Sequence, residues 1–188
     1  MTELGETAER ASEMQAIDAF DLSALSVKDL LQLESGIVRE LRHRDLVRTI
    51  NKPLGDIAEQ VVWLARGGVL EPNSTKSHDI TTSGGQRIQV KAMTVRKSGR
   101  SAKFSPFRSL DFDTAVFLVF ENVLFDLVEA YEVTANDIHE HVRLVPHING
   151  RQPTLRKVEG LGWDISLEMG AAYERLNHGL PVPVESAD

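Results

Sequence analysis

The chain has 188 residues, of which 41% are hydrophobic and 26% are charged, and it contains no cysteine. This length predicts one domain. The apolar fraction is sufficient for a packed core, so a wholly disordered chain is not expected. The lack of cysteine excludes disulfide scaffolds, thiolate zinc sites and cysteine nucleophiles. The acidic first 25 residues lack the apolar core of a signal peptide, and no apolar run approaches the roughly 18 residues of a membrane helix. We therefore expect a cytoplasmic protein without a membrane partner.

The net charge of −7 is spread unevenly along the chain. Residues 1–22 carry six acids and one base, and Glu185 and Asp188 add two acids at the other end, so residues 23–184 have no net charge. No acid occurs between Asp79 and Asp111. That interval contains seven basic residues: Arg87, Lys91, Arg96, Lys97, Arg100, Lys103 and Arg108. A basic stretch on a neutral body predicts a polyanionic partner.

Two helices are expected in the first part of the chain. Ser26, with Asp29 three residues later, resembles a capping box, and apolar residues at helical spacing continue to about Leu46. A second amphipathic helix begins near Leu54 and ends at Gly67-Gly68.

The next segment predicts a β-hairpin. A short strand is expected from about His78 to Thr82, and Ser83-Gly84-Gly85 is typical of a tight turn. The return strand, 86–94, alternates, with Ile88, Val90 and Ala92 on the apolar face.

The second half predicts two further strands and two helices. Residues 114–120 form a nearly continuous apolar run, typical of a strand covered on both faces, and another strand is expected around 124–133. Thr134 caps an expected helix to about Arg143, residues 146–162 are expected to form a loop, and a last helix is expected near 166–176. This order predicts an α/β domain with a mixed central sheet of about four or five strands flanked by helices.

The expected organisation has three parts: an acidic mobile arm (1–22), a single domain (23–178) and a flexible tail (179–188).

One group of polar residues could carry chemistry. Asp79 lies at the start of the first hairpin strand, and Gln89 and Lys91 share one face of the return strand because alternate residues point the same way. Folding about Gly84 would bring Asp79 near them, and Glu59 lies upstream on the flank of the second helix. The spacing alone is a weak pattern.

These residue types suit phosphodiester hydrolysis with a metal ion. Mg²⁺ concentrates positive charge at the phosphate and activates water, and it prefers oxygen ligands. Asp79 and Glu59 would supply carboxylates, Gln89 an amide oxygen and Val90 a backbone carbonyl. Lys91 would orient or deprotonate the water, or stabilise charge on the phosphate.

The pattern resembles the PD-(D/E)XK nuclease superfamily, whose fold is restriction-endonuclease-like. That family has an upstream helical Glu, a strand Asp and Glu/Gln-x-Lys on the next strand, which here match Glu59, Asp79 and Gln89-Val90-Lys91. The segment 55–91 is similar to uncharacterised bacterial members, and the elements expected over 114–143 match the family layout, so the resemblance covers about residues 54–143.

The resemblance implies a Mg²⁺-dependent endonuclease, of restriction or defence type, that hydrolyses DNA and accepts Mn²⁺ in place of Mg²⁺. It places Asp79 and Gln89 at the metal, Glu59 at or beside it, and Lys91 as the catalytic lysine. The basic residues expected to contact DNA are Lys76, Arg96, Lys97, Arg100, Lys103 and Arg108. His78 stands where the family has proline, and Gln89, in place of an acid, removes one negative charge from the metal site.

Simpler interpretations exist for each residue. Without the resemblance, Glu59 would be read as a solvated helix acid, and each residue alone could have a structural role: Asp79 at a strand start or turn, and Lys91 as an edge-strand residue that prevents aggregation. Phe104 and Phe107 would either stack on bases or anchor the basic loop to the core.

Two alternative functions remain open. Gln89 favours a non-cleaving nucleic-acid-binding module with the same fold, and the acidic arm and the tail favour a subunit of a larger defence complex. A homodimer would also fit, because cutting both strands of DNA commonly needs two sites.

Overall fold

The structure is a computed structural model, and it describes residues 22–48, 53–72, 77–95 and 101–177. Apart from residue 22, the predicted arm and the predicted tail lie outside these ranges. The chain divides into two units, Met1–Ile50 and Asn51–Asp188, which are described separately.

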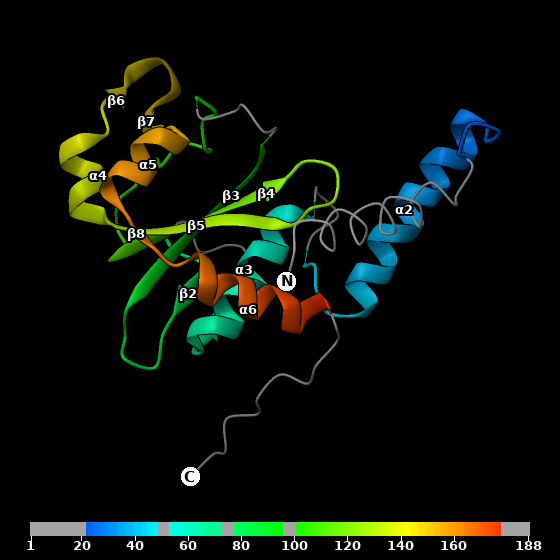
Figure 1. Cartoon of the computed structure of the whole chain (residues 1–188), viewed down its shortest axis with the longest axis horizontal. Coiled ribbons are helices and arrows are strands. Elements are labelled where there is room, and N and C mark those ends of the chain that lie inside the picture. The colour runs from blue at the N-terminus through cyan, green and yellow to red at the C-terminus, as the bar shows by residue number, and fades with distance from the viewer. Residues whose placement is uncertain (1–21, 49–52, 73–76, 96–100, 178–188) are drawn as a thin grey trace, which may run out of the picture. The chain divides into compact units, whose positions relative to one another are not determined.

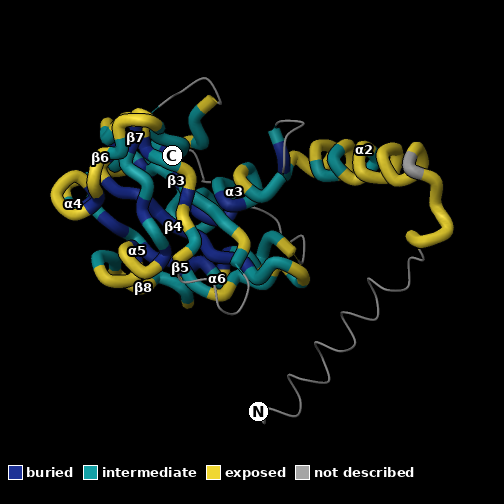
Figure 2. Tube along the Cα trace, turned by 90° about the horizontal axis from the view of Figure 1, so that it is seen from above, coloured by how far each residue is buried: buried dark blue, intermediate teal, exposed yellow. Residues whose placement is uncertain are grey.

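The first unit contains helix α2 (Val27–His43). The predicted capping box is confirmed: the backbone N–H of Asp29 donates to Ser26 Oγ at 3.2 Å, and the backbone N–H of Ser26 donates to the Asp29 carboxylate at 3.3 Å. The helix ends three residues before the predicted Leu46. Its surface is largely exposed, including Leu31 at 61% (Figure 2).

The second unit is built on a six-stranded sheet of order β1-β2-β3-β4-β5-β8 (Figure 1). β3 and β4 are parallel, and the other neighbouring strands are antiparallel, so the predicted mixed sheet is confirmed. The sheet has more strands than the four or five expected. The two-residue strands at its edges are too short to show the alternation of apolar and polar residues that predicts a strand. The strands are β1 (Val69–Leu70), β2 (Ile80–Thr81), β3 (Arg87–Val95), β4 (Thr114–Glu121), β5 (Leu127–Thr134) and β8 (Trp163–Asp164).

Helices cover both faces of this sheet (Figure 1). α3 (Leu54–Arg66) and α6 (Ser166–Asn177) pack on one face, and the shorter α4 (Ala135–His141) and α5 (Leu155–Leu161) pack on the other. The predicted starts of three of these helices, at residues 54, 135 and 166, are confirmed.

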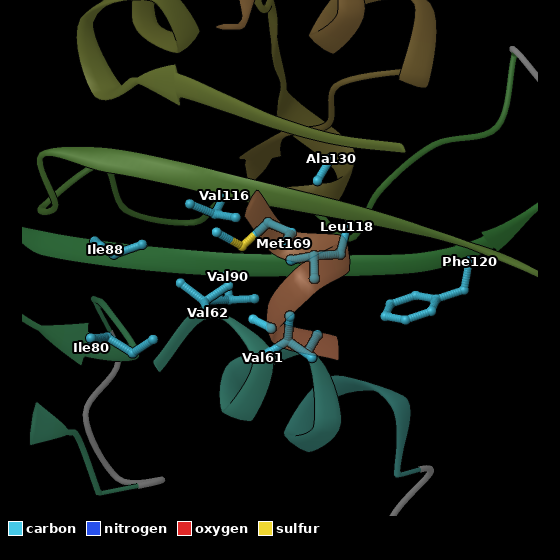
Figure 3. Packing of buried hydrophobic residues seen from close by; sticks show 12 residues of the cluster. Val61, Val62, Ile80, Ile88, Val90, Val116, Leu118, Phe120, Ala130 and Met169 are labelled. Carbon is cyan, nitrogen blue, oxygen red and sulfur yellow. The ribbon is translucent and has the colours of Figure 1, made fainter. Parts of the chain in front are cut away.

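Strand β4 lies at the centre of the core. Residues 114–120 are all buried, as their continuous apolar sequence predicted (Figure 2). On one face, Val116 and Leu118 meet Val61 of α3 and Met169 of α6, and Figure 3 shows these side chains converging between the sheet and the two helices. On the opposite face, Phe117 contacts Phe104 with ring centroids 4.8 Å apart.

The prediction of a loop over 146–162 is wrong. The segment contains a 3-10 turn (Pro146–Ile148), strand β7 (Gly150–Arg151), which pairs with β6 (Leu144–Val145), and helix α5. Thr154 caps α5, its side chain accepting from the backbone N–H of Lys157 at 3.2 Å. A seven-residue helix shows only one or two apolar repeats, so periodicity could not reveal it.

Other boundaries also moved. The strand expected over 78–82 is shorter, because only Ile80 and Thr81 pair with β3. The helix expected to reach about Arg143 ends at His141. β1 had not been foreseen. Gly68, before β1, has a φ of +90°, and a Cβ there would lie 2.3 Å from the carbonyl oxygen of Thr81, so this close approach requires glycine.

Candidate functional site

The β2–β3 hairpin positions the first site residue. Ile80 pairs with Ile88, which places Asp79, immediately before β2, opposite Gln89. The backbone N–H of Asp79 also donates to the carbonyl of Ile88 at 2.9 Å. The turn that sets this register is the predicted one, with Gly85 at a φ of +81°.

The Asp79 carboxylate is held against the edge of β3. It accepts a hydrogen bond from the backbone N–H of Val90 at 2.6 Å and another from the side-chain amide of Gln89. In a β-strand the N–H and C=O of one residue point to the same edge, so the Val90 carbonyl is directed to the side occupied by Asp79. Three oxygen-bearing groups predicted at the metal therefore come together here.

Lys91 lies two residues beyond Gln89, on the same face of β3. Burial lowers the pKa of its ammonium, and the negative charges of Asp79 and Glu59 partly oppose that shift. Both carboxylates therefore act electrostatically on Lys91, and the hydrogen bonds of the Asp79 carboxylate join it to Gln89 and Val90. Glu59 is half-buried on α3, which packs on the Val90 face of β3, whereas Lys91 lies on the opposite face of that strand.

The ammonium of Lys91 also contacts an aromatic ring. Its Nζ lies 5.2 Å from the ring centroid of Phe107, a cation–π geometry. This contact was not foreseen, because nothing in the spacing of the two residues links them. It is inconsistent with Lys91 as a solvent-facing residue that merely protects a strand edge.

A groove of about 330 Å³ opens beside Lys91. Its walls are formed by β3 and by the segment 101–110, which we call the strap. The lining residues are Gln89, Lys91, Ser105, Pro106, Phe107, Arg108 and Ser109. Of the predicted site residues, Gln89 and Lys91 line this groove, whereas Asp79, Val90 and Glu59 are not among its lining residues.

The aromatic residues of the strap serve as anchors. Phe104 is fully buried and Phe107 is 4% exposed, and both pack against Phe117 of β4. The prediction that they hold the basic loop to the core is confirmed, and their burial leaves no free ring face on which a base would stack.

The predicted DNA-binding cations fall into two groups. Lys103 and Arg108 are exposed on the strap. The other four, Lys76, Arg96, Lys97 and Arg100, lie outside the described residues. Arg87, which contributed to the basic stretch, is bound by acids instead: its guanidinium lies 2.6 Å from the Asp111 carboxylate and 3.5 Å from that of Asp113.

The donor set determines which metal would fit. Within the described ranges, no group of three or more His, Cys, Asp or Glu side chains is arranged to hold a metal ion. The hairpin offers one carboxylate (Asp79), one amide (Gln89) and one backbone carbonyl (Val90), and in this structure both Gln89 and Val90 turn an N–H toward the Asp79 carboxylate. Mg²⁺ commonly binds through one or two carboxylates and keeps several waters, so this set fits Mg²⁺ better than a metal that needs nitrogen or sulfur ligands.

A Gln89→Glu substitution tests this metal site. Without metal, the variant is expected to be about 1–3 kcal/mol less stable, because the amide donor to Asp79 is lost and two carboxylates face each other. Mg²⁺ is expected to raise its melting temperature more than that of the wild type, because the added charge strengthens binding. Thermal denaturation with and without Mg²⁺ measures both effects. The control is Gln32→Glu on exposed α2, and an equal Mg²⁺ shift in both variants would contradict the site.

No protein-family model matches the chain, and no curated protein sequence matches it either. The structure also shows, over its described residues, no helix that is both long enough and apolar enough to cross a membrane.

Proposed function

We propose that the second unit is a Mg²⁺-dependent endonuclease, of restriction or defence type, that hydrolyses phosphodiester bonds in DNA. The observation that carries this proposal is the hydrogen-bonded hairpin site, in which Asp79, Gln89 and the Val90 backbone meet, with the half-buried Lys91 two residues beyond Gln89 on the same strand. The resemblance of these residues to the PD-(D/E)XK pattern supports it.

Each residue has a defined role in the proposal. Asp79, Gln89 and the Val90 carbonyl would hold the ion, and Glu59 would assist from α3. When bound, Mg²⁺ supplies positive charge at the phosphate and acidifies water. Lys91 would donate a hydrogen bond to the phosphate or the attacking water from its position in the groove next to Phe107. Arg108 and Lys103 of the strap would bind neighbouring phosphates.

The direct test is incubation of the purified full chain with supercoiled plasmid. We expect nicked or linear DNA with Mg²⁺ or Mn²⁺, and none with EDTA, because the site residues alone lack the charge to activate water. An Asp79→Asn preparation controls for contaminating nucleases, since it removes the metal-binding charge and retains an oxygen acceptor for Val90.

A second function is favoured by one observation. The Gln89 amide donates to Asp79 and brings no negative charge, which suits a module that binds nucleic acid without cleaving it. A gel shift in EDTA, combined with intact plasmid in Mg²⁺ and Mn²⁺, would contradict the nuclease and support this module.

A further inference from the structure

A second basic stretch lies far from the first in the sequence. No acid occurs between Glu140 and Glu159, and this interval contains four basic residues: Arg143, Arg151, Arg156 and Lys157. Like residues 80–110, it is an acid-free segment of a chain whose net charge is negative.

The fold brings the two acid-free segments side by side. Lys103 of the strap forms a β-bridge with Thr154, and Phe107 forms one with Arg151. Phe107 and Arg151 exchange both backbone hydrogen bonds at 2.9 Å, and the N–H of Leu155 donates to the carbonyl of Ala102 at 2.9 Å. The strap, which forms one wall of the Lys91 groove, is thus hydrogen-bonded to the segment that leads into α5.

The basic residues of these two paired segments differ in how far they are exposed to solvent. Arg151 is half buried and donates to the carbonyl of Val142, so it has a structural role. Arg156 and Lys157 are exposed at the start of α5, next to Thr154. Lys103, opposite Thr154, is exposed as well.

The arrangement favours a linear polyanion over a small anion. Lys103 and Arg108 are five residues apart on the strap, a backbone span of at most about 18 Å, and Arg156 and Lys157 follow Thr154, which pairs with Lys103. Duplex DNA presents a negative charge about every 1.7 Å along its axis, so it can meet such a row at several positions.

We propose that Arg156 and Lys157, together with Lys103 and Arg108 of the strap, form a phosphate-binding surface that extends the Lys91 groove along the DNA backbone. This inference rests on the proposed function for its ligand, but it concerns binding and not cleavage. It assigns nucleic-acid contacts to a segment that the sequence did not single out.

The test is DNA binding by the full chain in EDTA, which separates binding from catalysis. Fluorescence anisotropy with a labelled duplex is measured over a salt series for the wild type and for Arg156→Gln/Lys157→Gln. We expect about tenfold weaker binding and a salt slope reduced by about 1 for each lost phosphate contact. The matched control is Lys28→Gln/Arg39→Gln, which removes the same charge from exposed positions of α2.

Three results would overturn this inference. An equal loss of affinity in the control variant would show that binding follows net charge and not this surface. If the wild type does not bind DNA, then DNA is not the ligand of this surface. Displacement of DNA by polyglutamate at equal charge would point to an acidic protein as the partner. If binding depends on Arg156 and Lys157 but the plasmid stays intact in Mg²⁺, the inference stands and the nuclease proposal fails.

Discussion

Lys91→Met is expected to reduce DNA cleavage by about a thousandfold or more, because it removes the hydrogen-bond donor and the cation that the proposed site contributes to the phosphate or the water. Methionine keeps the length and apolar body of the side chain, so the packing against Phe107 is largely preserved. Initial rates of plasmid nicking in Mg²⁺ measure the effect.

The control for this variant is Lys28→Met on exposed α2, which removes the same charge from the first unit of the chain. It is expected to cleave at the wild-type rate. Cleavage by Lys91→Met at the rate of this control would show that Lys91 has no part in the reaction.

Lys91→Met is also expected to change how the free energy of unfolding depends on pH. The folded protein lowers the pKa of Lys91, so the charged form is disfavoured relative to the unfolded chain. That unfavourable contribution is fully present below the folded pKa and disappears as the pH rises through the ordinary lysine value of 10.5. Lys91→Met is therefore expected to be at least as stable as the wild type at neutral pH, with the difference decreasing toward pH 10.5. Urea denaturation at several pH values measures it.

Phe104→Ala is expected to destabilise the protein by about 3–5 kcal/mol, because Phe104 is fully buried and its ring packs at 4.8 Å on Phe117. Urea denaturation followed by circular dichroism gives the change in the free energy of unfolding. Leu167→Ala is the control, since Leu167 is 90% exposed, and its effect is expected to stay within about 0.5 kcal/mol. Similar values for both variants would mean that the strap is not anchored in the core.

The hairpin and the central strand could be predicted because local signals determine them. The Ser83-Gly84-Gly85 turn sets the register, alternation assigns Gln89 and Lys91 to one face, and the proximity of Asp79 to Gln89 then follows. The continuous apolar run of β4 likewise predicts its position, because a strand that is apolar on both sides is stable only where both faces of the sheet are covered.

What could not be predicted depends on contacts between distant segments. The position of Phe107 near Lys91 requires the strap to return across β3, and no pattern within the strap encodes that path. The pairing of the strap with residues 151–154 is similarly invisible, because each partner contributes isolated bridges without alternation. Arg87 illustrates the opposite error, since its membership of a basic stretch did not reveal its acidic partners Asp111 and Asp113.

The anchoring of the strap has a consequence for how the protein loses activity. Many binding loops open locally while the rest of the molecule stays folded. Here the strap carries two phenylalanines of the core, so its detachment would expose the hydrophobic cluster on one face of the sheet. Loss of the groove on heating should therefore coincide with cooperative melting of the second unit, and amide hydrogens of the strap bonded to residues 151–153 should exchange with solvent as slowly as those of β4.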